Sequence, residues 1–520
     1  MTATNAQTDL LLVNFDASLT APSKPSSRYI AAILVSDGRA RVLSTDSDIR
    51  RHTSAGARVL DCQGLPLLPG FVDAHCHVMA YASSLLAVDC RVPAVSSIAD
   101  VNNAILVRAR STLDGQWVRA VGYQEFDLTE KRHPTRHDLD KASPNHPVRL
   151  LHQSGHAMVL NSLGLLAAGI TSATDEPAGG TIDRDPLTGE PTGLLLEMAD
   201  FFRDRIPRLT AYELRKATKM ASDKYLSCGI TSVYDASPSN TPQHYRRVEK
   251  LQQDGDFIPS VNMMAGAAHI NEFTDEGLVL GSGNDRLSIG HVKIMVTLSG
   301  GSLSPAQDEL ADLINKAHSL QWPVAIHTVE VEAFEAALNA LESAAPLPSD
   351  QLRDRIEHCS ECTDSLLPEL ARLRVAVVTN PSFIYHNGDR YLAETQNEHT
   401  PWIYRVQSLL EHDVPVFAGS DAPAADPNPM HGIYGAMTRR TSSGRQLNPK
   451  ESIGLRRAIG LYNLSLGETG QGGFHHRYIG DDGPADLVLL DRPLNEDEPE
   501  ELLNTKVVLT IRDGEVVYER

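Results

Sequence analysis

The chain has 520 residues, of which 41% are hydrophobic and 22% are charged, and its formal net charge is −20. This length suits about three domains or one large barrel with attachments, and the composition predicts a packed core and excludes large-scale disorder. So acidic a chain is a poor general binder of nucleic acid or anionic membranes, because both attract positive charge.

The sequence also bears on the compartment. Residues 1–9 are polar and lack the basic and apolar regions of a secretory signal. No apolar run has the length that crosses a bilayer, and six cysteines in a chain this long do not resemble a disulfide framework. We expect a cytoplasmic protein.

Both ends of the chain are rich in short apolar runs typical of β-strands. Turn signals of the Asp-Gly type occur at Asp37 and at Asp513. Because chain termini often lie close together, we expect the two ends to form one small β-unit. Its candidate strands are residues 10–15, 29–35, 40–44, 485–490 and 507–518.

Between Gly229 and Asp421, short apolar runs alternate with amphipathic stretches, as in repeated β-α units. With a strand that ends at His77, the runs make eight, the number that closes a parallel barrel. The alternative is an open, doubly wound sheet, but no glycine-rich phosphate loop supports it. The seven later candidate strands are residues 229–234, 258–264, 287–296, 323–327, 355–358, 375–379 and 414–419.

The stretch from residue 81 to residue 208 does not follow this rhythm and is too long for an ordinary loop. We therefore expect an inserted subdomain after the first barrel strand. It would overhang the barrel mouth, where active sites of this fold are built.

Residues that can bind a metal lie on or at the ends of five predicted barrel strands. A single histidine at such a position is more often a hydrogen-bonded core residue than a metal ligand, and a single lysine is more often a surface residue. In a barrel, however, these strand ends meet on one face. Imidazole and carboxylate suit zinc or a neighbouring divalent cation, and a buried lysine beside cations can lose its proton and add carbon dioxide as a bridging carbamate. The candidates are His75, His77, Lys293, His327, His358 and Asp421.

Together these residues resemble the amidohydrolase superfamily, in the subgroup that contains N-substituted formamide deformylases. The likeness rests on Pro69-Gly-Phe-Val-Asp-Ala-His-Cys-His77, Lys293, His327, Arg355-Ile-Glu-His358, Gly419-Ser-Asp421 and the closing run from Gly483 to Asp491. The chain departs from the subgroup at three stretches that we expect to face the mouth, which leaves the substrate open: residues 299–302, 328–330 and 379–381.

The resemblance implies an α/β fold, a distorted (β/α)8 barrel of the TIM type with a small β-sandwich. The sandwich would comprise residues 1–68 and 472–520, the barrel 69–80 and 209–471, and the insertion 81–208. It also implies two zinc ions per chain, one on His75 and His77 and the other on His327 and His358, with carboxylated Lys293 as a bridge. Asp421 would then be both a ligand and the catalytic proton carrier.

We therefore predict a metal-dependent hydrolase that cleaves a carbon–nitrogen bond, of the amide or N-formyl type, with a metal-activated hydroxide. Rivals on the same metal core are a deaminase, a lactonase and a metal-dependent decarboxylase, and a more distant rival is a non-catalytic scaffold. The expected partner is a small-molecule substrate, and we expect a homodimer.

The insertion supplies two candidate substrate contacts. His156 opens His-Ala-Met-Val-Leu-Asn-Ser, a stretch that also resembles the subgroup, and Tyr123 lies in Val-Gly-Tyr-Gln-Glu-Phe. Cys359 and Cys362 form a Cys-x-x-Cys without a second cysteine pair, so we expect spectator thiols there.

Overall fold

The computed structural model describes residues 9–19, 32–54, 56–177, 179–198, 201–202, 205–298, 301–349, 352–395, 399–466, 474–476, 479 and 482–520. The chain divides into two compact units. The first unit comprises residues 1–77, 222–421 and 425–520, and the second comprises residues 78–221 and 422–424. Residues 299–302 are one of the stretches where the sequence differs from the formamide deformylase subgroup, and residues 299 and 300 lie outside the described residues.

Eight parallel strands form the central sheet of the first unit, in the order β19-β18-β17-β16-β15-β14-β13-β6. All seven neighbouring pairs are parallel. Their bounds agree closely with the predicted strands, and the α/β barrel prediction is confirmed. The strands are β6 (Phe71–Cys76), β13 (Ile230–Asp235), β14 (Ser260–Gly266), β15 (Leu287–Met295), β16 (Val324–Thr328), β17 (Arg355–His358), β18 (Ala376–Thr379) and β19 (Val416–Ala418).

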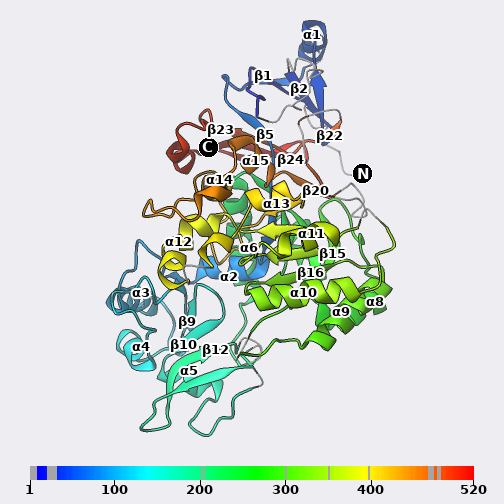
Figure 1. Ribbon diagram of the computed structural model, residues 1–520. Coiled ribbons are helices and arrows are strands. Elements are labelled where there is room, and N and C mark those ends of the chain that lie inside the picture. The colour runs from blue at the N-terminus through cyan, green and yellow to red at the C-terminus, as the bar shows by residue number, and fades with distance from the viewer. Residues whose placement is uncertain are drawn as a thin grey trace. The chain divides into compact units, whose positions relative to one another are not determined.

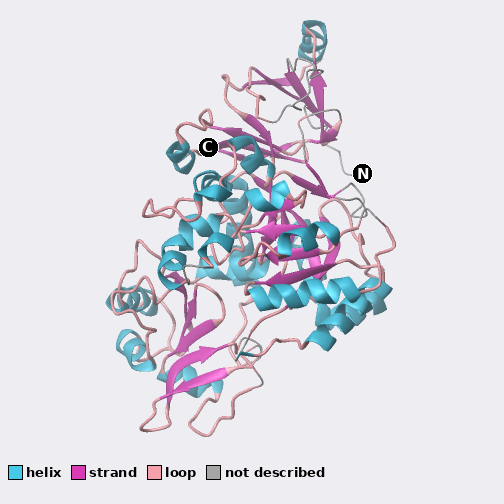
Figure 2. Ribbon diagram, in the orientation of Figure 1, coloured by secondary structure: helices cyan, strands magenta, loops and turns pink. Residues whose placement is uncertain are grey.

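Helices alternate with these strands and cover the sheet (Figures 1 and 2). In α10, Ala333, Phe334, Ala337 and Leu341 are buried at the three- and four-residue spacing that places side chains on one helix face. The helices are α6 (Ala211–Ser227), which begins in the second unit, α7 (Pro242–Gln253), α8 (Ile270–Asp275), α9 (Gln307–Ser319), α10 (Val331–Ser343), α11 (Leu366–Arg372), α12 (Ser382–Glu394), α13 (Gln407–Glu411), α14 (Pro429–Thr438) and α15 (Leu455–Gly460).

The two ends of the chain meet in two further sheets of the first unit, as expected. One has the order β22-β3-β2-β1-β4 and the other β25-β24-β23-β5. Both contribute side chains to a single core that includes Leu12, Ile33, Leu487 and Ile511. The strands are β1 (Leu10–Val13), β2 (Ala32–Ser36), β3 (Arg39–Leu43), β4 (Arg58–Asp61), β5 (Leu67–Pro69), β22 (Gly483–Pro484), β23 (Leu487–Leu490), β24 (Val507–Arg512) and β25 (Glu515–Glu519).

Two small elements complete the first unit. The helix α1 (Asp46–Ser54) lies between β3 and β4 in the chain. Strands β20 (Leu464–Leu466) and β21 (Phe474–His476) pair as a separate ribbon.

The second unit is built on a six-stranded mixed sheet in the order β11-β12-β10-β9-β8-β7. Strands β7, β8 and β9 are parallel to one another, and the other pairs are antiparallel. The elements are α2 (Val78–Leu86), β7 (Val88–Asp89), α3 (Ile98–Ala109), β8 (Val118–Tyr123), α4 (Arg136–Ala142), β9 (Val148–His152), β10 (Ala157–Leu160), α5 (Ser162–Ala168), β11 (Thr181–Arg184) and β12 (Pro191–Leu196). No helix in the described part of the chain has the length and apolar character needed to span a membrane.

Candidate metal centre

All six predicted ligands lie in the first unit, on or just after strands of the parallel sheet. His75 is in β6 and His77 directly follows that strand, while Asp421 comes three residues after β19. Lys293, His327 and His358 lie in β15, β16 and β17.

The structure brings His75, His77 and Asp421 together in one compact group. The Nε2 atom of His77 is 3.0 Å from Oδ1 of Asp421, and Nε2 of His75 is 3.6 Å from the same oxygen. One ligand atom from each residue lies within 4.8 Å of the other two. This group is a candidate metal site, although Asp421 is 344 positions from His77 in the chain.

Two further imidazoles extend this group. The ring centroids of His75 and His358 are 4.6 Å apart, and those of His358 and His327 are 4.5 Å apart. Lys293 is also buried, with 1% of its surface exposed. A continuous row of imidazoles therefore runs across the carboxyl ends of the strands.

The rings of His75, His77 and His358 are each oriented by a hydrogen bond from Nδ1. His75 donates from Nδ1 to Glu357, and His358 donates to Oδ1 of Asn380 at 2.8 Å. Nδ1 of His77 lies 3.2 Å from Oγ of Ser237, whose own hydroxyl donates to Asp235 at 2.6 Å, so the serine oxygen accepts. A proton on Nδ1 leaves the lone pair on Nε2, which is the form that binds a metal.

This arrangement fits a cation. With its Nδ1 hydrogen directed at Ser237, His77 presents the lone pair of Nε2 to a carboxylate oxygen 3.0 Å away. Two electron-rich atoms at that separation are stabilised by a cation between them, and zinc bonds of about 2.0–2.2 Å to nitrogen and oxygen span such a gap. Among the described residues, the buried Nε2 of His75 and Nζ of Lys293 also have no hydrogen-bond partner.

Glu357 links the site to the interior of the barrel. Its carboxylate accepts from Nε and Nη2 of Arg355 at 2.8 and 3.0 Å as well as from His75, and both Glu357 and Arg355 are 0% exposed. A charged, doubly bonded carboxylate holds the imidazole in one orientation and tautomer. The Arg-Ile-Glu-His motif contained this residue, but sequence analysis assigned a role to its histidine alone.

The backbone at the end of β17 explains how neighbouring residues reach the same site. A regular strand would direct Glu357 and His358 to opposite faces. His358 instead has a φ of +68°, and both residues contact the ring of His75. Asp421, with a φ of +55°, has the same left-handed conformation. Such backbone is costly outside glycine and concentrates at functional sites.

The two outermost strands of the parallel sheet, β19 and β6, are joined at this site. Ser420 donates from its backbone N and its hydroxyl to the carboxylate of buried Asp73, at 2.8 and 2.5 Å, and Asp421 donates from N to the His75 carbonyl at 2.8 Å. Gly419 is required here, because a Cβ at that position would lie 2.6 Å from the backbone nitrogen of His75. The segment that carries Asp421 is therefore fixed against β6.

Burial sets the charge state of the site. It lowers the pKa of Lys293 to about 8, although the charges of Glu357 and Asp421 oppose this, and it lowers the pKa values of His75 and His358. Burial alone would raise the pKa of Asp421, but the contact with His77 and the neighbouring imidazoles outweigh it and lower that pKa. Neutral imidazoles, an ionised carboxylate and an easily neutralised amine are the forms in which these groups bind metals.

The chain matches the model of a known family over residues 58–518, described as the amidohydrolase family. This chain belongs to that family. The predicted enzyme class, a metal-dependent hydrolase of carbon–nitrogen bonds other than peptide bonds, is thereby confirmed.

Relatives of this amidohydrolase cover nearly all of it. An N-substituted formamide deformylase of Arthrobacter pascens is 29% identical over 98% of each chain. A structure of an uncharacterised metal-dependent hydrolase from Pyrococcus horikoshii covers 94% of this chain and 99% of its own, with 22% identity and a TM-score of 0.71. The zinc complex of the atrazine chlorohydrolase TrzN from Arthrobacter aurescens covers 98% and 95%, with 13% identity and a TM-score of 0.53. These two structures show a shared fold.

The two predicted substrate contacts of the amidohydrolase lie in its second unit. The side chain of His156 is 45% exposed, and its Nδ1 is 3.0 Å from Oε1 of Glu197. Tyr123 is 0% exposed, and its hydroxyl is 3.0 Å from Nδ1 of His133. Tyr123 therefore contacts His133 through its hydroxyl and His152 through its ring, whose centroid is 5.2 Å from that of His152.

Tyr123 belongs to a group that we call the insertion cluster, formed by Tyr123, Glu125, His133 and His152. Glu125 lies 2.9 Å from Nε2 of His152 and 3.6 Å from Nδ1 of His133. The close contact with His152 lowers the pKa of Glu125 to about 2. Sequence analysis missed the two histidines of this cluster, because neither lies in a metal-ligand pattern.

Two other sequence observations have structural outcomes. Asn380, one of residues 379–381, directly follows β18, is fully buried and orients His358. Cys359 and Cys362 are buried free thiols.

Proposed function

We propose that this amidohydrolase hydrolyses an amide or N-formyl group of a small molecule. In this proposal it uses two divalent cations, which are zinc ions. The observation that carries the proposal is the meeting of Nε2 of His75 and Nε2 of His77 at Oδ1 of Asp421, while the Nδ1 hydrogens of these rings are engaged by Glu357 and Ser237. The likeness to a formamide deformylase along the whole chain supports the choice of bond.

In this proposal, His75 and His77 hold one cation and His327 and His358 hold the other. Bound divalent cations supply a hydroxide nucleophile at neutral pH and polarise the scissile carbonyl as Lewis acids. Asp421 is ionised and lies beside both His75 and His77, so it can accept the nucleophile's proton at Oδ1 and return it to the leaving amine.

Lys293 completes the proposed centre as a carbamate. A buried amine without a hydrogen-bond partner and with a pKa near 8 is neutral for part of the time at physiological pH, and the neutral amine is the form that adds carbon dioxide. The resulting anion supplies two oxygen atoms, one for each cation, and removes the cost of an unpaired buried group.

The remaining proposals concern the substrate and the assembly. We propose that His156 contacts the substrate directly, since its ring is half exposed, and that Tyr123 acts through His133. A homodimer also stays a proposal, which the molecular mass in solution would test.

The experiment that tests the proposed function is a product analysis on protein with measured metal content. N-substituted formamides and simple amides should give an amine and a carboxylate, and a chelator should abolish turnover. Ammonia alone, a hydroxyacid or carbon dioxide as the product would instead identify a deaminase, a lactonase or a decarboxylase. Full turnover after exhaustive removal of metal would contradict the proposal.

A further inference from the structure

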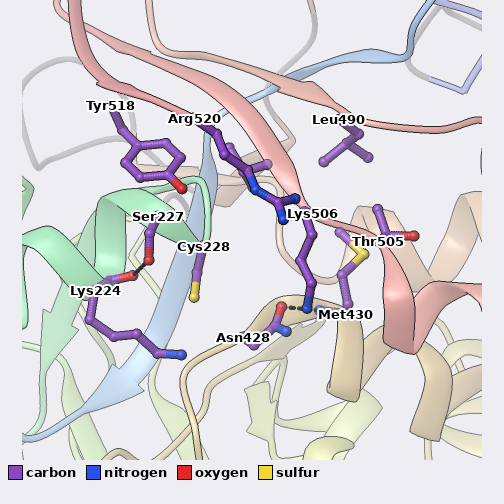
Figure 3. A pocket seen from close by; sticks show the side chains of 11 residues that line it. Lys224, Ser227, Cys228, Asn428, Met430, Leu490, Thr505, Lys506, Tyr518 and Arg520 are labelled. Atoms are coloured by element: carbon purple, nitrogen blue, oxygen red, sulfur yellow. Dashed lines mark hydrogen bonds between the residues drawn. The ribbon is translucent and has the colours of Figure 1, made fainter.

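The first unit contains a pocket that shares no residue with the metal centre. Its volume is about 240 Å³, and its lining comes from the end of α6, the start of α14 and the strands β23 and β25 with the segment before β24 (Figure 3). The floor is apolar and buried: Met430, Leu490 and Val507 are 3%, 0% and 6% exposed. An apolar floor of this kind suits the body of a small organic molecule.

Three cationic side chains from distant parts of the chain surround this floor, although the protein as a whole carries a net charge of −20. They are Lys224 in α6, Lys506 just before β24, and Arg520 just after β25. In the view of Figure 3 the Lys506 ammonium points toward Asn428, the Arg520 guanidinium lies toward the other end of the Lys506 side chain, and Lys224 is on the opposite side of the pocket.

Nearby carboxylates neutralise part of this charge. Lys224 lies 3.0 Å from Asp426, and Arg520 lies 3.7 Å from Asp491. The described residues offer Lys506 no carboxylate within ion-pair distance. The pocket therefore has one positive charge in excess, which matches a monoanion better than a dianion.

The other polar groups limit what a ligand can use. Ser227 and Thr505 donate their hydroxyl protons to the carbonyls of Lys224 and Glu501, at 2.8 and 2.9 Å. They can therefore only accept. Donors for an anion come from the three cations, from the hydroxyl of Tyr518 and from the side-chain amide of Asn428, whose Oδ1 accepts from the backbone N of Met430.

We propose that this pocket binds a small carboxylate whose apolar body lies on the floor formed by Met430, Leu490 and Val507. The carboxylate lies on the Arg520 guanidinium, because a guanidinium fork donates two parallel hydrogen bonds to such a group, and Lys506 supplies the positive charge of the pocket that no carboxylate of the described residues neutralises. The proposal is independent of the proposed function, because no lining residue belongs to the metal centre.

Benzoate is a suitable probe, since it combines one carboxylate with a compact apolar ring. Titration calorimetry on the metal-loaded protein should show saturable binding to one site, with a Kd on the order of 1 mM, as expected for a ligand of this size. Benzamide has the same shape without the charge and should not bind measurably. Acetate has the charge without the ring and should bind at least about tenfold more weakly.

Two variants of exposed residues test the site without disturbing the fold. Lys506→Glu should abolish benzoate binding and Arg520→Gln should weaken it about tenfold, as expected for the loss of a charged hydrogen bond. Arg457→Gln in α15 removes an exposed cation outside the pocket and is the matched control.

Benzoate could also bind at the metal centre, and His75→Ala separates the two sites. Binding that survives in His75→Ala but is lost in Lys506→Glu supports the pocket. Binding that is lost in His75→Ala and unchanged in both pocket variants overturns the proposal, as does an absence of saturable binding to the native protein.

Discussion

The metal centre and the insertion cluster contain the same types of side chain but use their ring nitrogens in opposite ways. In the centre, Nδ1 of His75, His77 and His358 is a donor, so the lone pair on Nε2 is free for a cation. In the insertion cluster, Nδ1 of His152 accepts from the backbone N of Ser154 at 3.1 Å.

The proton of His152 is therefore on Nε2, which faces Glu125 at 2.9 Å. One arrangement leaves a group of acceptors that needs a cation, and in the other the Nε2 hydrogen of His152 already donates to the Glu125 carboxylate. A histidine close to a carboxylate is therefore not enough to identify a metal site. The hydrogen-bond partner of the other ring nitrogen must also be known, because it decides which nitrogen keeps a lone pair for a metal.

The difference between the two groups is tested most directly by removing one imidazole from each of them. His75→Ala should lose bound metal and all measurable activity, because a lost imidazole cannot be replaced by its neighbours, and His327→Ala should do the same. His152→Ala should keep the full metal content. Elemental analysis and kcat on the same preparations, with circular dichroism to check folding, would decide this, and a His75→Ala protein with normal metal content would refute it.

The second prediction concerns Lys293. Lys293→Ala should lose both activity and metal, since a neutral methyl group cannot bridge two cations. A short-chain carboxylic acid should restore part of the activity by occupying the vacated space. A crystal structure of the metal-loaded native protein with an unmodified, unliganded amine at Lys293 would exclude the bridge.

A third variant separates chemistry from metal retention. Asp421→Asn keeps the size and one oxygen ligand but removes the base, so it should keep much of its metal and lose about a hundredfold or more in kcat, the scale of a lost general base. The comparison requires metal content and kcat on one preparation. A near-normal kcat with both metals present would move the proton-carrying role elsewhere, and His156 would be tested first.

Glu357→Gln tests whether the orientation of His75 contributes to metal binding, because it keeps the shape of the side chain but removes the charge that orients the ring. The affinity for metal should fall about tenfold to a hundredfold, measured by competition with a chelator.

Glu451→Gln is the matched control for this variant. Glu451 is 3% exposed and 3.0 Å from Arg405, so its loss should also destabilise the protein. An equal loss of metal affinity in both variants would show that Glu357 acts only through general stability.

The smallest expected effect belongs to the insertion cluster and depends on pH. The folded-state pKa of Glu125 is lowered from 4.5 to about 2, so its contribution to stability is present above pH 4.5 and is lost as the pH falls toward 2. Because the pair is partly exposed, this contribution should be less than about 1 kcal/mol. Glu125→Gln should reduce the free energy of unfolding at pH 7 and remove this part of its acid dependence, and urea titrations at pH 7 and pH 3 would measure both.

Much of the fold could be predicted from the sequence because its signals are local. Strands such as 375–379 are short apolar runs, and the structure has β18 at Ala376–Thr379. The six candidate ligands could be proposed from the sequence because each lies on or near the end of a predicted strand, and a parallel barrel brings those ends together. The structure places them on or just after strands of the parallel sheet and gathers His75, His77 and Asp421 in one group.

The orienting residues could not be found in the same way. Neighbouring residues of a regular strand point to opposite faces, so the sequence alone does not predict that Glu357 and His358 share a site. They do so because His358 has a left-handed backbone conformation. A non-glycine residue with positive φ leaves no clear trace in a sequence. Asn380 and Ser237 likewise lie far along the chain from the histidines that they hold, and no local pattern connects them.

The join between β6 and β19 gives the proposed cations a role in folding. These strands are the two ends of the pairing order in the parallel sheet, and Gly419, Ser420 and Asp421 connect them through Asp73 and His75. A cation shared by His75 and Asp421 would therefore cross-link the first and last strands of the barrel. By thermodynamic linkage, whatever free energy the cation releases on binding also opposes separation of these strands. Metal supply would then govern how long the folded enzyme persists as well as how fast it turns over.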